Sequence, residues 1–149
     1  MYKSGFRKFP KVLIGGCFDL IHVGHIHVLS EASKYGLVLV AVLSDRYIQS
    51  YKGKDRPIIN EEERLAMVSA IKWVTDAFIC DEDAYSNEML TKIRPDIVII
   101  GKENAEKRNT SNMIQRIKNV LENVRVVEIE RFKSNKISTT KIINHIRQI

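Results

Sequence analysis

Two histidines, His22 and His25, stand three residues apart directly after a glycine-rich turn. The turn, Gly15-Gly16-Cys17-Phe18-Asp19, follows the apolar run 12–14, and the stretch 25–35 after it has an amphipathic, helix-like pattern. Adjacent glycines let the backbone approach a ligand closely. Imidazoles at a helix entrance lie beside the positive end of the helix dipole, where anions bind. This order of strand, glycine turn and histidine-bearing helix start predicts a site for a polyphosphate.

Apolar runs alternate with helix-like segments along the rest of the chain. Strands are expected at 12–16, 37–43, 77–80, 96–101 and 125–129, and helices at 25–35, 60–73, 86–93, 113–121 and 138–146, with a polar loop over 44–59. Runs of Val, Ile and Leu without polar alternation suit strands that are covered on both faces. Their alternation with helices predicts one doubly wound (Rossmann-like) α/β domain over 1–149, with about five parallel strands and helices on both faces.

Ligands of doubly wound sheets bind beyond the carboxyl ends of the strands, at the point where the strand order reverses. Several polar segments of this chain follow predicted strand ends. They are residues 15–19, 44–54, 101–104 and 137–140. We therefore expect these segments to meet around one crevice.

Charge and composition restrict the class of protein. The chain has 149 residues, of which 44% are hydrophobic and 28% charged, as in ordinary globular proteins. Residues 1–11 and 131–149 together carry nine basic side chains and no acidic one, and 1–10 is expected to be a flexible basic tail. A nucleic-acid binder more often spreads its basic residues over a structured face, so no nucleic-acid partner is expected. No apolar run approaches the roughly 20 residues that cross a bilayer, so no membrane partner is expected. The two cysteines are too few for a disulfide framework, which favours the cytoplasm.

The glycine turn and the histidine pair resemble the signature of the cytidylyltransferase-like nucleotidyltransferase superfamily. Its members carry Gly-x-Phe-Asp and then His-x-Gly-His, which here are Gly16-Cys17-Phe18-Asp19 and His22-Val23-Gly24-His25. The segment Lys52-Gly53-Lys54-Asp55-Arg56-Pro57, followed by Arg64, looks like the Lys-Gly-x-x-Arg-Pro loop and arginine of the sugar-phosphate members. Pro95-Asp96, Gly101 and the run from Ile137 to Ile143 also match in order, so the resemblance covers nearly the whole chain.

The resemblance implies an enzyme that transfers AMP or CMP from a nucleoside triphosphate to a small phosphorylated acceptor and releases pyrophosphate. Mg²⁺ would accompany the triphosphate, with few protein ligands. Because negative charge grows around the α-phosphorus, such catalysis rests on positioning and on electrostatic stabilisation. The implied catalytic residues are His22, His25 and Lys52. The implied nucleotide-binding residues are Gly16, Cys17, Phe18, Gly24, Lys54, Gly101, Ile137, Ser138, Thr139 and Thr140, and the implied substrate-binding residues are Asp19, Arg64 and Lys133.

Details of the motifs bear on the branch of the superfamily. Glycerol-phosphate cytidylyltransferases usually carry Arg-Thr-x-x before Ile-Ser-Thr-Thr, where this chain has Lys133-Ser134-Asn135-Lys136, with Arg131 displaced by two. Either Lys133 or Arg131 therefore fills the basic position. Val23 also stands where those enzymes often carry an aromatic residue. These features favour a heptose-phosphate adenylyltransferase for envelope polysaccharide synthesis, with a glycerol-3-phosphate cytidylyltransferase as the alternative.

Two further alternatives stay open. One is a flavin- or coenzyme-forming adenylyltransferase of the same superfamily, against which the Ser-Thr-Thr ending and the sugar-type loop argue. The other is a nucleotide- or RNA-binding module without catalysis, which the basic ends favour. Because members of the superfamily commonly form dimers, a homodimer is expected.

Overall fold

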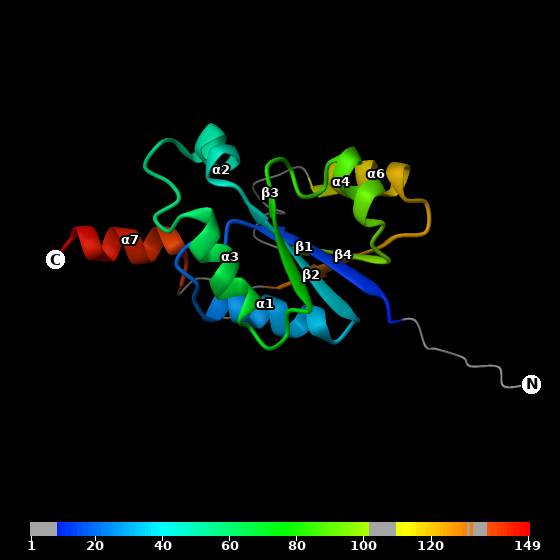
Figure 1. Ribbon diagram of the computed structural model, residues 1–149, viewed down its shortest axis with the longest axis horizontal. Coiled ribbons are helices and arrows are strands. Elements are labelled where there is room, and N and C mark those ends of the chain that lie inside the picture. The colour runs from blue at the N-terminus through cyan, green and yellow to red at the C-terminus, as the bar shows by residue number, and fades with distance from the viewer. Residues whose placement is uncertain (1–8, 102–109, 131, 133–136) are drawn as a thin grey trace, which may run out of the picture.

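Five parallel strands form one sheet in the order β3-β2-β1-β4-β5 (Figure 1). The strands are β1 (Lys11–Gly16), β2 (Leu37–Leu43), β3 (Asp76–Cys80), β4 (Ile97–Gly101) and β5 (Arg125–Ile129). The computed structural model describes residues 9–101, 110–130, 132 and 137–149. From β1 the chain adds strands on one side as far as β3, and then crosses over to add β4 and β5 on the other side. The strand order therefore reverses between β1 and β4, and the predicted doubly wound fold is confirmed.

Helices cover both faces of this sheet (Figure 1). On one face lie α1 (Val23–Ser33) and α3 (Glu61–Ser69), and on the other lie α2 (Asp45–Lys52), α4 (Asn87–Ile93) and α6 (Thr110–Val120). The last helix, α7 (Thr139–Arg147), buries none of its residues and extends from the side of the sheet (Figure 1). Among the described residues, no helix combines the length and the apolar character needed to cross a membrane.

Alternate residues of the strands face two separate hydrophobic cores. Leu13 of β1 packs in one core with Leu90 of α4 and Ile117 of α6, and all three side chains are fully buried. The neighbouring residue Val12 faces the opposite core, together with Leu29 of α1. The inner strands β1, β2 and β4 are covered on both sides, so their apolar runs do not alternate, as the sequence pattern predicted, whereas the edge strands β3 and β5 are partly exposed and include Asp76, Arg125 and Glu128.

The predicted loop over 44–59 is wrong in its first half, where the chain forms α2. The Ser44 hydroxyl caps this helix by accepting a hydrogen bond from the Tyr47 N–H at 3.0 Å. Asp45 places a negative charge in the first turn, and Ile48, only 1% exposed, attaches the helix to the core. Tyr47, Ile48 and Tyr51 recur at helical spacing, but the helix has only eight residues and most of them are polar, and this composition concealed the pattern.

Candidate active site

A cavity of about 290 Å³ lies beyond the carboxyl end of β1, where the strand order reverses. Its walls come from the glycine turn, the start of α1, the end of α2 and the start of α7. Each segment expected to meet around one crevice contributes at least one lining residue, and residues 102–104 fall outside the described residues. The predicted residues along the cavity are Gly16, Cys17, Phe18, Asp19, His22, Gly24, His25, Lys52, Gly101, Ile137, Ser138, Thr139 and Thr140.

Three predicted residues stand apart from this set. Lys54 is exposed and does not line the cavity, and Arg64 lies behind the cavity wall. Lys133, together with its rival Arg131, falls outside the described residues. Several lining residues had no predicted role, notably Tyr51, Arg56 and Tyr85.

Both histidine side chains accept backbone hydrogen bonds at the start of α1. The His22 Nδ1 accepts a hydrogen bond from the Gly24 N–H at 3.1 Å, and the His25 Nδ1 accepts one from the His22 N–H at 3.3 Å. These bonds cap the helix, which begins at Val23, two residues before the predicted start. Because Nδ1 is the acceptor in each ring, a neutral imidazole carries its hydrogen on Nε2. The two rings, with centroids 4.0 Å apart, therefore present Nε2 as their donor nitrogen.

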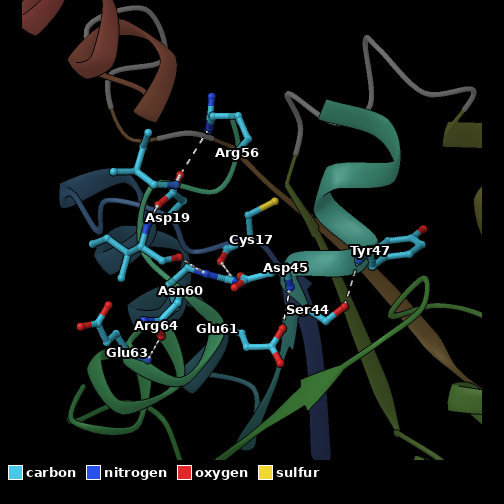
Figure 2. A network of polar contacts seen from close by, with 12 residues as sticks. Cys17, Asp19, Ser44, Asp45, Tyr47, Arg56, Asn60, Glu61, Glu63 and Arg64 are labelled. Carbon is cyan, nitrogen blue, oxygen red and sulfur yellow. Dashed lines mark hydrogen bonds and ion pairs between the residues drawn. The ribbon is translucent and has the colours of Figure 1, made fainter. Parts of the chain in front are cut away.

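Asp19 sits in a strained turn and ties three segments together. Its neighbours Phe18 and Leu20 have φ of 52° and 48°, in the left-handed region that costs such residues about 1–2 kcal/mol each. The buried Asp19 carboxylate accepts hydrogen bonds from the N–H groups of Ile58 and Ile59 at 2.9 and 3.0 Å (Figure 2). Its backbone carbonyl accepts a bond from the Thr139 hydroxyl at 2.6 Å. The turn, the end of the α2–α3 connection and the start of α7 are thereby joined.

Arg64 is fully buried at the start of α3 and binds protein groups through each of its guanidinium nitrogens (Figure 2). Nε donates to the Ile59 carbonyl at 2.9 Å, Nη1 to the Cys17 carbonyl at 2.5 Å and Nη2 to the Asp45 carboxylate at 2.6 Å. The sequence predicted a substrate-binding arginine here. The structure instead places this side chain as a brace between the glycine turn and α2.

Lys52 reaches the cavity from the last turn of α2. Its Nζ lies 3.2 Å from Cys17 Sγ, which is also 3.2 Å from the Tyr51 hydroxyl. The next residue, Gly53, ends the helix with φ of 90°, and Lys54 after it is exposed and does not line the cavity. A helix, and not a flexible loop, therefore positions the lysine that lines the cavity.

Tyr85 closes the gap where β1 and β4 separate. The pairing of these strands ends at Ile14 and Ile99. One residue further on, the buried Tyr85 hydroxyl accepts a bond from the Gly15 N–H at 3.0 Å and donates one to the Ile99 carbonyl at 2.7 Å. Nothing in the local sequence around Tyr85 signals this contact, because its partners lie 70 and 14 residues away.

Charged groups outside the cavity secure the neighbouring strand ends. The Arg46 guanidinium and the Ser44 hydroxyl bind Asp81, and the hydrogen bond from Arg46 is the main cause that lowers the pKa of that carboxyl. Cys80, at the end of β3, is 2% exposed, and burial raises the pKa of its thiol. These contacts hold the ends of β2 and β3 beside each other.

Comparison with known proteins agrees with this geometry. The family described as cytidylyltransferase-like matches residues 13–145, so the chain belongs to that family, a class of nucleotidyltransferases. The FAD synthase of Thermococcus sibiricus is 33% identical over 94% of this chain and 94% of its own length. The bifunctional protein HldE of Campylobacter fetus is 36% identical over 91% of this chain, which spans only 28% of that protein. The crystal structure of the lipopolysaccharide core biosynthesis protein from Thermoplasma volcanium matches 84% of this chain with a TM-score of 0.71 and 28% identity, and 99% of that protein is covered.

Proposed function

We propose that the protein transfers AMP, or less readily CMP, from a nucleoside triphosphate to a phosphate monoester. An oxygen of the acceptor phosphate attacks the α-phosphorus, the bond between the α-phosphorus and the bridging oxygen breaks, and pyrophosphate leaves with that electron pair. The acceptor oxygen is already anionic, so the step requires no general base. The observation that carries this proposal is the paired arrangement of His22 and His25, with Nε2 as the donor nitrogen of both rings, in the wall of one cavity.

The lining residues suit the charges of this reaction. His22 and His25 would donate to the α-phosphate oxygens as their negative charge grows in the transition state. The Lys52 ammonium, at the end of α2, would offset part of the negative charge of the triphosphate. The start of α7, with Ser138 as its cap, offers N–H groups and hydroxyls to a further phosphate.

Magnesium fits this cavity as a companion of the triphosphate. Both carboxylate oxygens of Asp19, which lines the cavity, already accept backbone hydrogen bonds. No cluster of three potential ligands from His, Cys, Asp or Glu occurs in the described parts of the chain. Triphosphate oxygens and water would thus hold most of the ion's coordination positions, which suits the reluctance of Mg²⁺ to lose water. When bound, the ion would offset negative charge on the phosphates.

Two acceptors are the leading candidates. FMN is the first, because the FAD synthase relatives match this chain over nearly their whole length, and FAD consists of AMP joined to FMN. The motif-based argument against a flavin substrate loses its force for the same reason. A sugar phosphate, the acceptor favoured by the sequence motifs, is the second, supported by the likeness to a lipopolysaccharide core biosynthesis protein.

A pyrophosphate-release screen tests the proposal. ATP and CTP are each combined with FMN, a heptose 1-phosphate and glycerol 3-phosphate, and the nucleotide product is identified by mass spectrometry. We expect release that requires both the triphosphate and one phosphorylated acceptor, with ATP preferred. Hydrolysis of ATP without an acceptor, or RNA binding without any turnover, would contradict the proposal.

A further inference from the structure

Arg56 lines the cavity and has no role in the chemistry described so far. It belongs to the connection between α2 and α3, just before the residues that Asp19 holds. Its side chain is 18% exposed, and its Nε atom is buried. The guanidinium nevertheless makes no hydrogen bond with any described residue, although the Asp19 carboxylate lies 3.4 Å from Nε.

Such an arrangement is unusual for a largely buried arginine. A guanidinium carries five N–H donors, and buried donors are nearly always hydrogen-bonded. Asp19 is a poor partner, because both of its carboxylate oxygens already accept backbone N–H groups. Arg64, on the other side of Asp19, uses every one of its nitrogens on protein oxygens (Figure 2). Arg56 thus combines a positive charge with unused donors at the cavity wall.

The position of Arg56 indicates what these donors would meet. Asp19, its ion-pair partner, also accepts the hydroxyl hydrogen bond of Thr139 in the first turn of α7. Ser138 and Thr140 line the same cavity. The guanidinium and the positive end of the α7 dipole therefore lie near one another, across Asp19. Two fixed sources of positive potential in one corner favour a multiply charged anion.

We propose that Arg56 binds a substrate phosphate, in the corner between the α2–α3 connection and the start of α7. The fork of a guanidinium matches two oxygens of a phosphate, which a lysine in the same place does not do. That this phosphate belongs to a substrate rests on the proposed function. It is either the terminal part of the triphosphate or the phosphate of the acceptor, and these two sources share the same chemistry.

Binding measurements on variants test this assignment without turnover. Arg56→Gln removes the charge, Arg56→Lys keeps the charge without the fork, and Arg46→Gln is the control, since Arg46 is 81% exposed and pairs with Asp81 outside the cavity. Calorimetry with ATP, pyrophosphate and inorganic phosphate gives the affinities, and circular dichroism verifies folding. We expect Arg56→Gln to weaken binding about 10- to 100-fold, Arg56→Lys to lose part of this, and Arg46→Gln to bind normally.

The probes distinguish the two sources. Weaker binding of both ATP and pyrophosphate assigns Arg56 to the triphosphate. Weaker binding of inorganic phosphate to the ATP-saturated protein, with ATP affinity unchanged, assigns it to the acceptor. Unchanged affinities for all probes in folded Arg56→Gln, or a wild-type protein that binds none of them, would overturn the proposal. Because no turnover is measured, a protein that binds these anions but transfers no nucleotide refutes the proposed function and leaves this test intact.

Discussion

Asp19 and Arg64 bind the two polar groups of a single residue, Ile59. The Ile59 N–H donates to the Asp19 carboxylate at 3.0 Å, and the Ile59 carbonyl accepts from Arg64 Nε at 2.9 Å. Arg64 also binds the carbonyl of Cys17, two residues before Asp19. The segment that follows the basic loop is consequently fixed to the glycine turn from both sides. Asp19 and Arg64 are both buried and are bonded to protein groups. They therefore support the connection that carries the cavity-lining Arg56.

Replacing Arg64 is expected to destabilise the fold. Arg64→Met fills a similar volume but leaves the Asp45 carboxylate and two carbonyls without their donors. Breaking such a buried network costs about 3–5 kcal/mol in the free energy of unfolding. Urea denaturation measures the loss, with Arg46→Met as the exposed control, expected to leave the free energy of unfolding nearly unchanged. Equal changes in the free energy of unfolding for the two substitutions would show that the hydrogen bonds of Arg64 do not stabilise the fold.

Loss of His25 is expected to slow turnover while the protein remains folded. His25→Ala removes one of the two proposed donors to the α-phosphate and should lower kcat about 100-fold or more. The lost capping bond to the His22 N–H costs only about 1 kcal/mol. His27→Ala is the matched control, since His27 lies on the same helix but does not line the cavity. A His25→Ala protein with wild-type kcat would refute the assigned role.

Gly15 is expected to tolerate no side chain. A Cβ at this position would lie 2.1 Å from the Cβ of Ala84, so the two segments would have to separate. Gly15→Ala should lower the free energy of unfolding by about 1–3 kcal/mol. Gly101→Ala at the end of β4 provides the comparison, because no atom of the described residues lies within 4 Å of its added Cβ. Thermal melts of both variants measure the difference in their melting temperatures. Equal melting temperatures would show that the turn accommodates a side chain at Gly15.

Tyr85 is expected to stabilise the separation of β1 and β4 through its hydroxyl. Tyr85→Phe keeps the packing but leaves the Gly15 N–H and the Ile99 carbonyl without this partner. The cost should be about 1–3 kcal/mol, with faster hydrogen exchange at the Gly15 amide. Tyr35→Phe serves as the control, since the Tyr35 ring packs on Arg125 and its hydroxyl makes no hydrogen bond within the described chain. Unchanged exchange at Gly15 would count against the bridge.

The two cysteines are expected to differ in reactivity. Burial raises the pKa of the Cys80 thiol, so at neutral pH less of it is thiolate, and its labelling should accelerate only as the pH rises toward that raised value. Cys17 lines the cavity beside Lys52 and should be labelled first by a small maleimide. Cys17→Ser should abolish the fast phase, and ATP should slow it. Equal labelling of both thiols at pH 7 would contradict this order.

Local pattern was sufficient to predict the strands and the placement of His22 and His25 at a helix start beside the cavity, because both depend on near neighbours. Apolar runs mark strands covered on both faces, and the spacing of His22 and His25 encodes their mutual capping. Distant contacts were beyond such reasoning. Arg64 was predicted to bind substrate, yet one of its partners lies 47 residues away, and that partner is a backbone carbonyl, which leaves no trace in the residue type. Tyr85 escaped notice for the same reason.

The bond between the Thr139 hydroxyl and the Asp19 carbonyl connects positions 120 residues apart. Contacts of such long separation close large loops, and the entropy this costs makes them form late in folding. The sheet can pair β1 with β2 and β4 before the chain reaches α7. During synthesis on the ribosome, the growing chain would accordingly acquire its core first and the proposed phosphate-binding corner last.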